Sequence, residues 1–72
     1  MDITMVLMEI RRRLGLSRPE LSRMMGFADN YIWLLEHKYR KPSIETCLKI
    51  MAVSRDKACF KVEFGMLRDD LK

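Results

Sequence analysis

Apolar residues recur at helical spacing in the first fourteen positions of the chain. One side of a helix with 3.6 residues per turn would carry Ile3, Val6, Leu7, Ile10 and Leu14. Asp2 precedes this run as a plausible N-cap, and Gly15 follows it at a position where glycine commonly ends helices. The pattern predicts a first helix over residues 3–14.

The next stretch, LSRPELSRMMG, has the signals of a second, very short helix. Ser17 and Glu20 have capping-box spacing, in which each side chain binds a backbone N–H at the helix start. Pro19 fits the first turn, where its missing N–H is not needed. Gly26 closes the helix after roughly two turns, which are marginal without tertiary contacts.

A third short helix is predicted from near Ala28 or Asp29 to about His37, within FADNYIWLLEH. At about 100° per residue, Ile32 and Leu35 point toward a core. The outer side of this helix is unusually apolar, because Trp33 and Leu34 lie outside the inward arc, beside Asn30 and His37.

Pro42 and Ser43 mark the start of a fourth helix, with Ser43 as its N-cap and an apolar side at Cys47, Leu48, Ile50 and Met51. The C-terminal part supports two interpretations. Phe60, Val62 and Phe64 alternate with charged residues as in a strand, whereas Phe60, Phe64, Leu67 and Leu71 have helical spacing. The helix is favoured, and a strand stays open.

Length and composition restrict the kinds of protein to which the chain can belong. Seventy-two residues make one domain, of 1–72, and two cysteines without CxxC spacing or a secretory signal indicate free thiols in a reducing, cytoplasmic protein. No apolar run approaches the ~20 residues of a membrane span. His37 with Cys47 or Cys59 has neither the number nor the spacing of zinc ligands. We therefore expect no metal, no cofactor and no enzymatic activity.

Charge gives the first functional hint. The formal net charge is +4 and the sequence pI is about 9.4. A basic excess of this kind is typical of nucleic-acid binding, because neutralised phosphates release counterions, although a solvated surface has the same composition.

Two short helices joined by a turn at a glycine describe a helix-turn-helix. The register here consists of Arg11, GLSRPELS at 15–22, GF at 26–27, Ile32, Leu35, Glu36, Arg40, PS at 42–43 and LKIMA at 48–52. Over about residues 3–53 it resembles the Cro/phage-repressor (XRE-like) family. The chain has Arg18, Ser22, Ala28 and Lys38 where the family usually has Gln, Ala, Ser or Thr, and Gly. The resemblance implies an all-α, lambda-repressor-like domain of four or five helices that binds double-stranded DNA.

The resemblance makes the third helix the recognition helix, which enters the major groove. Base-reading residues would be Asp29, Asn30, Trp33 and Leu34. Asn30 suits adenine, whereas Asp29 either accepts from cytosine or caps the helix. Phosphate contacts would come from Ser17, Arg18, His37, Tyr39, Arg40, Lys41 and Ser43, with base reading by Arg18 also possible. Arg11 and Glu36 would form a structural ion pair.

Trp33 and Leu34 allow three interpretations: contact with thymine methyl groups, a protein partner on this face, or packing on the chain's own C-terminal segment.

The function expected is a sequence-specific DNA-binding transcriptional regulator, most simply a dimeric repressor on a pseudo-palindromic operator. Residues 54–72 would dimerise it, through Phe60, Val62, Phe64 and Leu67. The alternative is a protein-interaction module that binds another regulator through the Trp33/Leu34 face.

Overall fold

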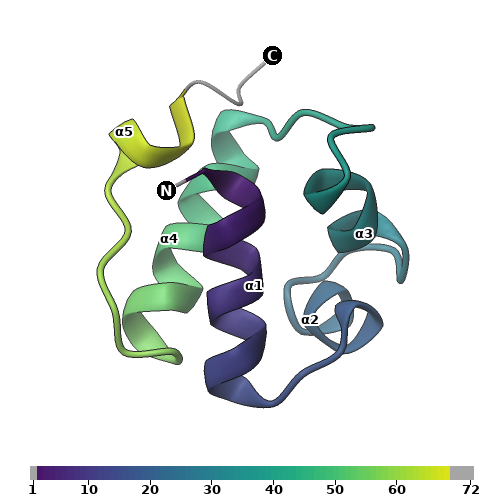
Figure 1. The fold of residues 1–72 in the computed structure, drawn as a ribbon, viewed down its shortest axis with the longest axis horizontal. Coiled ribbons are helices and arrows are strands. Elements are labelled where there is room, and N and C mark those ends of the chain that lie inside the picture. Colours follow the sequence, from purple (N-terminus) through teal and green to yellow (C-terminus); the bar gives the residue numbers. More distant parts are fainter. Residues whose placement is uncertain (1, 69–72) are drawn as a thin grey trace.

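The computed structural model describes residues 2–68, which form five helices (Figure 1). The helices are α1 (Ile3–Leu14), α2 (Arg18–Met24), α3 (Tyr31–Glu36), α4 (Ile44–Asp56) and α5 (Phe64–Leu67). The described part contains no strand. The predicted all-α class is confirmed, and α2, α3 and the turn between them form the predicted helix-turn-helix.

Helix α1 occupies the centre of the view in Figure 1, between α4 on one side and the α2–α3 pair on the other. Its ends follow the sequence signals. The Asp2 carboxylate accepts a hydrogen bond from the Met5 N–H at 3.0 Å, and Gly15 adopts the left-handed conformation with φ of 67°. Its inward residues Ile3, Val6, Leu7 and Ile10 are buried and form the middle of the core.

The capping box of α2 is confirmed. Ser17 Oγ accepts from the Glu20 N–H at 3.3 Å, and the Ser17 N–H donates to Glu20 Oε1 at 2.9 Å. These bonds, the backbone one first, lower the pKa of the Glu20 carboxyl. Gly26 then turns the chain toward α3 with φ of 82°.

Buried Ser22 joins the two helices of the motif. Its Oγ accepts a hydrogen bond from the backbone N–H of Ile32 at 3.1 Å. That N–H lies in the first turn of α3, where no intrahelical acceptor exists. Asn30, the N-cap residue of α3, makes no side-chain cap bond. Ser22 therefore caps α3 from the neighbouring helix.

Helix α3 begins later than predicted, at Tyr31 rather than Ala28 or Asp29. The intervening residues form a turn in which the Tyr31 N–H donates to the Ala28 carbonyl at 3.0 Å. Asp29 does not cap the helix, because its carboxylate binds Arg23 instead. The capping alternative for Asp29 is therefore wrong.

The C-terminal end of α3 is fixed by Lys38 in the left-handed conformation, with φ of 63°. The N–H groups of Lys38 and Tyr39 donate to the Leu35 and Leu34 carbonyls at 3.2 and 3.0 Å. This pair of backbone hydrogen bonds is a Schellman motif. Lys38 therefore has the left-handed conformation that glycine adopts most easily.

Residues 57–68, after α4, form no strand, and only one turn of them is helical. Residues 59–63 have no regular structure, but Val62 is buried between exposed Lys61 and Glu63, as in a strand. One helical turn, α5, follows and buries Leu67. Figure 1 shows this segment returning along α4 to the side of the molecule away from α3. Leu71 lies outside the described residues.

None of the helices in residues 2–68 is long and apolar enough to cross a membrane.

Candidate nucleic-acid interface

Helix α3 separates its two sides as the sequence predicted. Ile32 and Leu35 are fully buried against the core, whereas Trp33 is 39% exposed and Leu34 is partly buried. Asn30, just before the helix, is exposed. The outer side of α3 is therefore available to a ligand.

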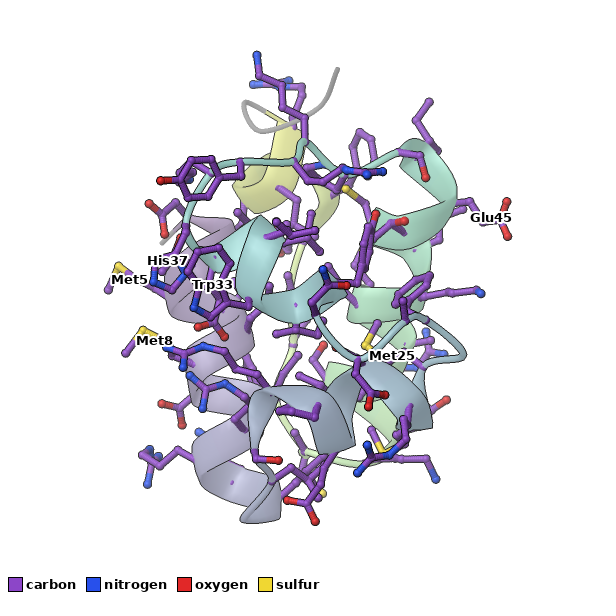
Figure 2. All side chains as sticks on the ribbon, turned by 90° about the vertical axis from the view of Figure 1, so that its right-hand side faces the viewer. Met5, Met8, Met25, Trp33, His37 and Glu45 are labelled. Atoms are coloured by element: carbon purple, nitrogen blue, oxygen red, sulfur yellow. The ribbon has the colours of Figure 1, made fainter. Side chains whose placement is uncertain are left out.

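Three parallel rings cover part of this outer side. Trp33 stacks on His37, with ring centroids 4.0 Å apart, and on Tyr39, with centroids 5.6 Å apart. Tyr39 is 74% exposed. Figure 2 shows Trp33 and His37 at the same edge of the view as Met5 and Met8, two exposed methionines that project from α1. An aromatic surface with exposed methionines nearby thus lies on the outer side of α3.

Within residues 2–68, the Trp33 ring does not stack on an aromatic ring of the C-terminal segment. Its ring contacts are with His37 and Tyr39, and α5 lies across the molecule from α3 in Figure 1. Within residues 2–68 the third interpretation is therefore not supported for Trp33, and the exposed part of its ring is available to DNA or to a protein.

His37 is constrained by its own helix. Its Nδ1 lies 2.9 Å from the Trp33 carbonyl oxygen, which can only accept, so Nδ1 carries the proton. In the neutral ring Nε2 is then an acceptor. The predicted phosphate contact by His37 therefore requires the protonated ring.

Asp29 and Asn30 lie together at the start of α3, both exposed. Asp29 forms an ion pair with Arg23 of α2 at 3.0 Å, and both side chains are largely solvent-accessible. An exposed pair of this kind is weak and can exchange for other partners. The Asn30 amide has no hydrogen bond in residues 2–68, so it is free to read a base edge.

The loop after α3 carries positive charge without local compensation. Arg40 and Lys41 are exposed and form no ion pair among the described residues. Other basic side chains have acidic partners: Arg12 and Arg13 share Glu9, and Arg55 binds Asp56. The uncompensated charge next to α3 matches the predicted phosphate contacts of the loop.

The two serines predicted to contact phosphate differ in whether the hydroxyl proton is free. Ser17 accepts at Oγ within the capping box and keeps its hydroxyl proton for another acceptor. Ser43 caps α4, but it also donates to Thr46 Oγ1 at 3.1 Å, which lies 3.3 Å from the Tyr31 hydroxyl. To donate to a phosphate, Ser43 would have to break its hydrogen bond to Thr46 Oγ1.

Glu36 is the centre of a buried ionic cluster. Its side chain is only 2% exposed. Arg11 binds it through two N–H groups, with Nε 2.9 Å from Oε2 and Nη2 3.1 Å from Oε1. The predicted Arg11–Glu36 pair is confirmed. The sequence did not indicate that Arg18 also binds, with Nε 2.9 Å from Oε1.

Two of the four predicted dimer residues are buried within the protomer. Val62 and Leu67 belong to its own core, so they have no surface to offer a second copy. The reason is the return of residues 57–63 along α4, which the sequence pattern does not encode. Phe60 and Phe64 are only partly buried. Phe60 already lies under the Arg13 guanidinium, 4.7 Å from the ring centroid.

Among residues 2–68, no three His, Cys, Asp or Glu side chains come together as a metal site would require.

Comparison of the chain with protein-family models gives no match, and searches of the curated proteins and of the solved structures give none either. The resemblance to the Cro/phage-repressor family therefore stays a prediction from the sequence.

Proposed function

We propose that this chain is a cytoplasmic, sequence-specific regulator that binds duplex DNA through its helix-turn-helix, and that it is not an enzyme. The simplest form is a Cro-like repressor that acts as a homodimer on a pseudo-palindromic operator. The observation that carries the proposal is the outer side of α3, exposed beside Asn30 and flanked by the uncompensated charges of Arg40 and Lys41.

The chemistry of each side chain suggests which part of DNA it would contact. Arg40, Lys41 and the Tyr39 hydroxyl would bind phosphates, which fixes register but carries no sequence information. Asn30 would pair with adenine, and the apolar groups of Trp33 and Leu34 would contact thymine methyl groups. The aromatic stack holds Trp33 in one orientation, which lowers the entropy lost on binding.

A salt titration on a labelled random duplex tests the phosphate contacts. Arg40→Ala or Lys41→Ala should weaken binding to all sequences alike and reduce the salt slope by about one. Lys57→Ala is the matched control, because this exposed lysine lies at the C-terminal end of α4. Equal slopes for Arg40→Ala, Lys41→Ala and the control would remove the loop from the interface.

Base reading is tested with a selected operator. Asn30→Ala should lose about 1–3 kcal/mol on the operator and little on random duplex. A uniform loss on both would reject base reading by Asn30.

A second candidate is a protein-interaction module, favoured by the exposed stack of Trp33, His37 and Tyr39 beside Met5 and Met8. Trp33 is the one tryptophan in the chain, so its fluorescence reports this face alone. Operator DNA should shift or quench the fluorescence if the face reads DNA. If DNA leaves it unchanged and a captured protein alters it, the second candidate is favoured.

A further inference from the structure

Two arginines share the one buried carboxylate of Glu36, but they use it differently. Arg11 is 19% exposed and presents Nε and Nη2 together as a fork. Arg18 is 38% exposed and donates only through Nε. The carboxylate neutralises one guanidinium, so the cluster keeps one excess positive charge.

The donors of Arg18 are mostly unused. A guanidinium has five N–H groups, four of them on the two Nη atoms. Neither Nη atom of Arg18 has a hydrogen bond among residues 2–68, and Glu36 binds the opposite end of the group, at Nε. Both Nη atoms are therefore free to bind an anion in the two-pronged geometry that suits phosphate.

Glu36 also restricts where those donors lie. An arginine side chain has many rotamers, and the bond at Nε restricts them before any ligand arrives. Glu36 is itself immobilised by Arg11 and by burial in α3. The position of the Arg18 guanidinium is thus set by the α1–α3 packing.

We infer that Glu36 is a positioning residue, which holds the Arg18 guanidinium so that its free Nη groups bind a DNA phosphate. The inference rests on the proposed function and identifies how one of its contacts is built. Glu36 itself touches no DNA.

The inference predicts a change opposite to that expected from charge alone. Glu36→Gln removes a negative charge close to the proposed interface, so a purely electrostatic role predicts tighter DNA binding. A positioning role predicts weaker binding, by about five- to tenfold, because the arginine must be ordered on binding. The sign of the effect separates the two roles.

The experiment measures affinity for a random duplex over a range of salt concentrations, for variants first shown to be folded by circular dichroism. Glu36→Gln should bind more weakly than the parent with an unchanged salt slope. Arg18→Gln should reduce the slope by about one. Glu9→Gln is the control, because it removes the same charge from a carboxylate that binds Arg12 and Arg13 but not Arg18. It should bind no more weakly than the parent.

A second comparison serves if Glu36→Gln does not fold. Arg18→Lys keeps the charge but replaces the planar fork with a single nitrogen, which cannot bind Glu36 and also hold a phosphate between two parallel N–H groups. We expect weaker binding than the parent at the same salt slope.

Each outcome has a definite meaning. Parent-like or tighter binding by Glu36→Gln, or parent-like affinity in Arg18→Lys, would overturn the positioning role while leaving DNA binding intact. A parent protein that binds no duplex at any salt concentration would overturn the proposed function and this inference together.

Discussion

Lys38 ends α3 in a backbone conformation that suits glycine. Its φ of 63° costs a residue with a Cβ atom about 1 kcal/mol. Lys38→Gly should therefore raise the free energy of unfolding by about 0.5–1 kcal/mol, less whatever the weak 3.6 Å contact with Asp2 contributes. Lys38→Ala is the control, since it removes the same charge and keeps the strain. Urea denaturation measures both, and a gain in the alanine variant equal to that in the glycine variant would contradict this account.

Glu9, in α1, makes the stability of the protein depend on pH. Hydrogen bonds from Arg12 first, and then from Arg13, lower its pKa from an ordinary 4.5 to about 2. A lowered pKa in the folded state stabilises the protein above the unfolded pKa. That stabilisation is lost as pH falls from about 4.5 toward about 2.

Glu9→Gln should flatten this dependence. Urea midpoints at pH 6, 4 and 2.5 should fall more in the parent than in the variant. Other carboxylates with lowered pKa values, such as Asp2 and Glu20, titrate in both proteins, so the difference isolates Glu9. Parallel pH profiles would show that the pair contributes nothing.

Residue-level signals were predictable where they act locally. The Asp2 and Ser43 caps and the Ser17–Glu20 capping box each depend on neighbours within four residues. The Arg18–Glu36 bond joins residues eighteen positions apart, and its existence depends on how α2 packs against α3. No local pattern encodes that contact.

At the scale of elements, Ser22 holds the helix-turn-helix together. Ser22→Ala leaves the Ile32 N–H buried without an acceptor, and we expect it to lower the free energy of unfolding by about 1–3 kcal/mol. Ser54→Ala is a matched control, because this buried serine donates to the Met51 carbonyl and its loss strands no N–H. Chemical denaturation compares them, and equal losses would remove the special role of Ser22.

Element types were predicted better than element boundaries. The first helix was predicted correctly over residues 3–14, because its apolar spacing spans three turns. The third helix begins at Tyr31, after a turn closed by the Tyr31 N–H and the Ala28 carbonyl, which the sequence pattern did not separate from a first helical turn. The outer side of α3 was identified from its 100° geometry. Whether it reads DNA depends on a ligand that the sequence does not contain.

At the scale of the whole molecule, α5 is part of the core rather than an appendage. Leu67→Ala should lower the free energy of unfolding by about 2–5 kcal/mol, because Leu67 is fully buried. Met66→Ala, at an exposed position of the same helix, should change it little. The loss should be the same at protein concentrations about a hundredfold apart. A loss seen only in concentrated samples would assign Leu67 to contact between copies, because stabilisation by a partner grows with concentration.

The two cysteines differ in a way that affects any study of assembly. Cys47 is buried, whereas Cys59 is exposed in the segment between α4 and α5, a segment that lies away from α3 in Figure 1. Air oxidation would therefore crosslink two copies through Cys59 and leave the outer side of α3 uncovered in both. Such a covalent dimer would sediment like a non-covalent one and would carry two helix-turn-helix motifs. A Cys59→Ser protein, or one kept in reductant, is the form in which self-association has biological meaning.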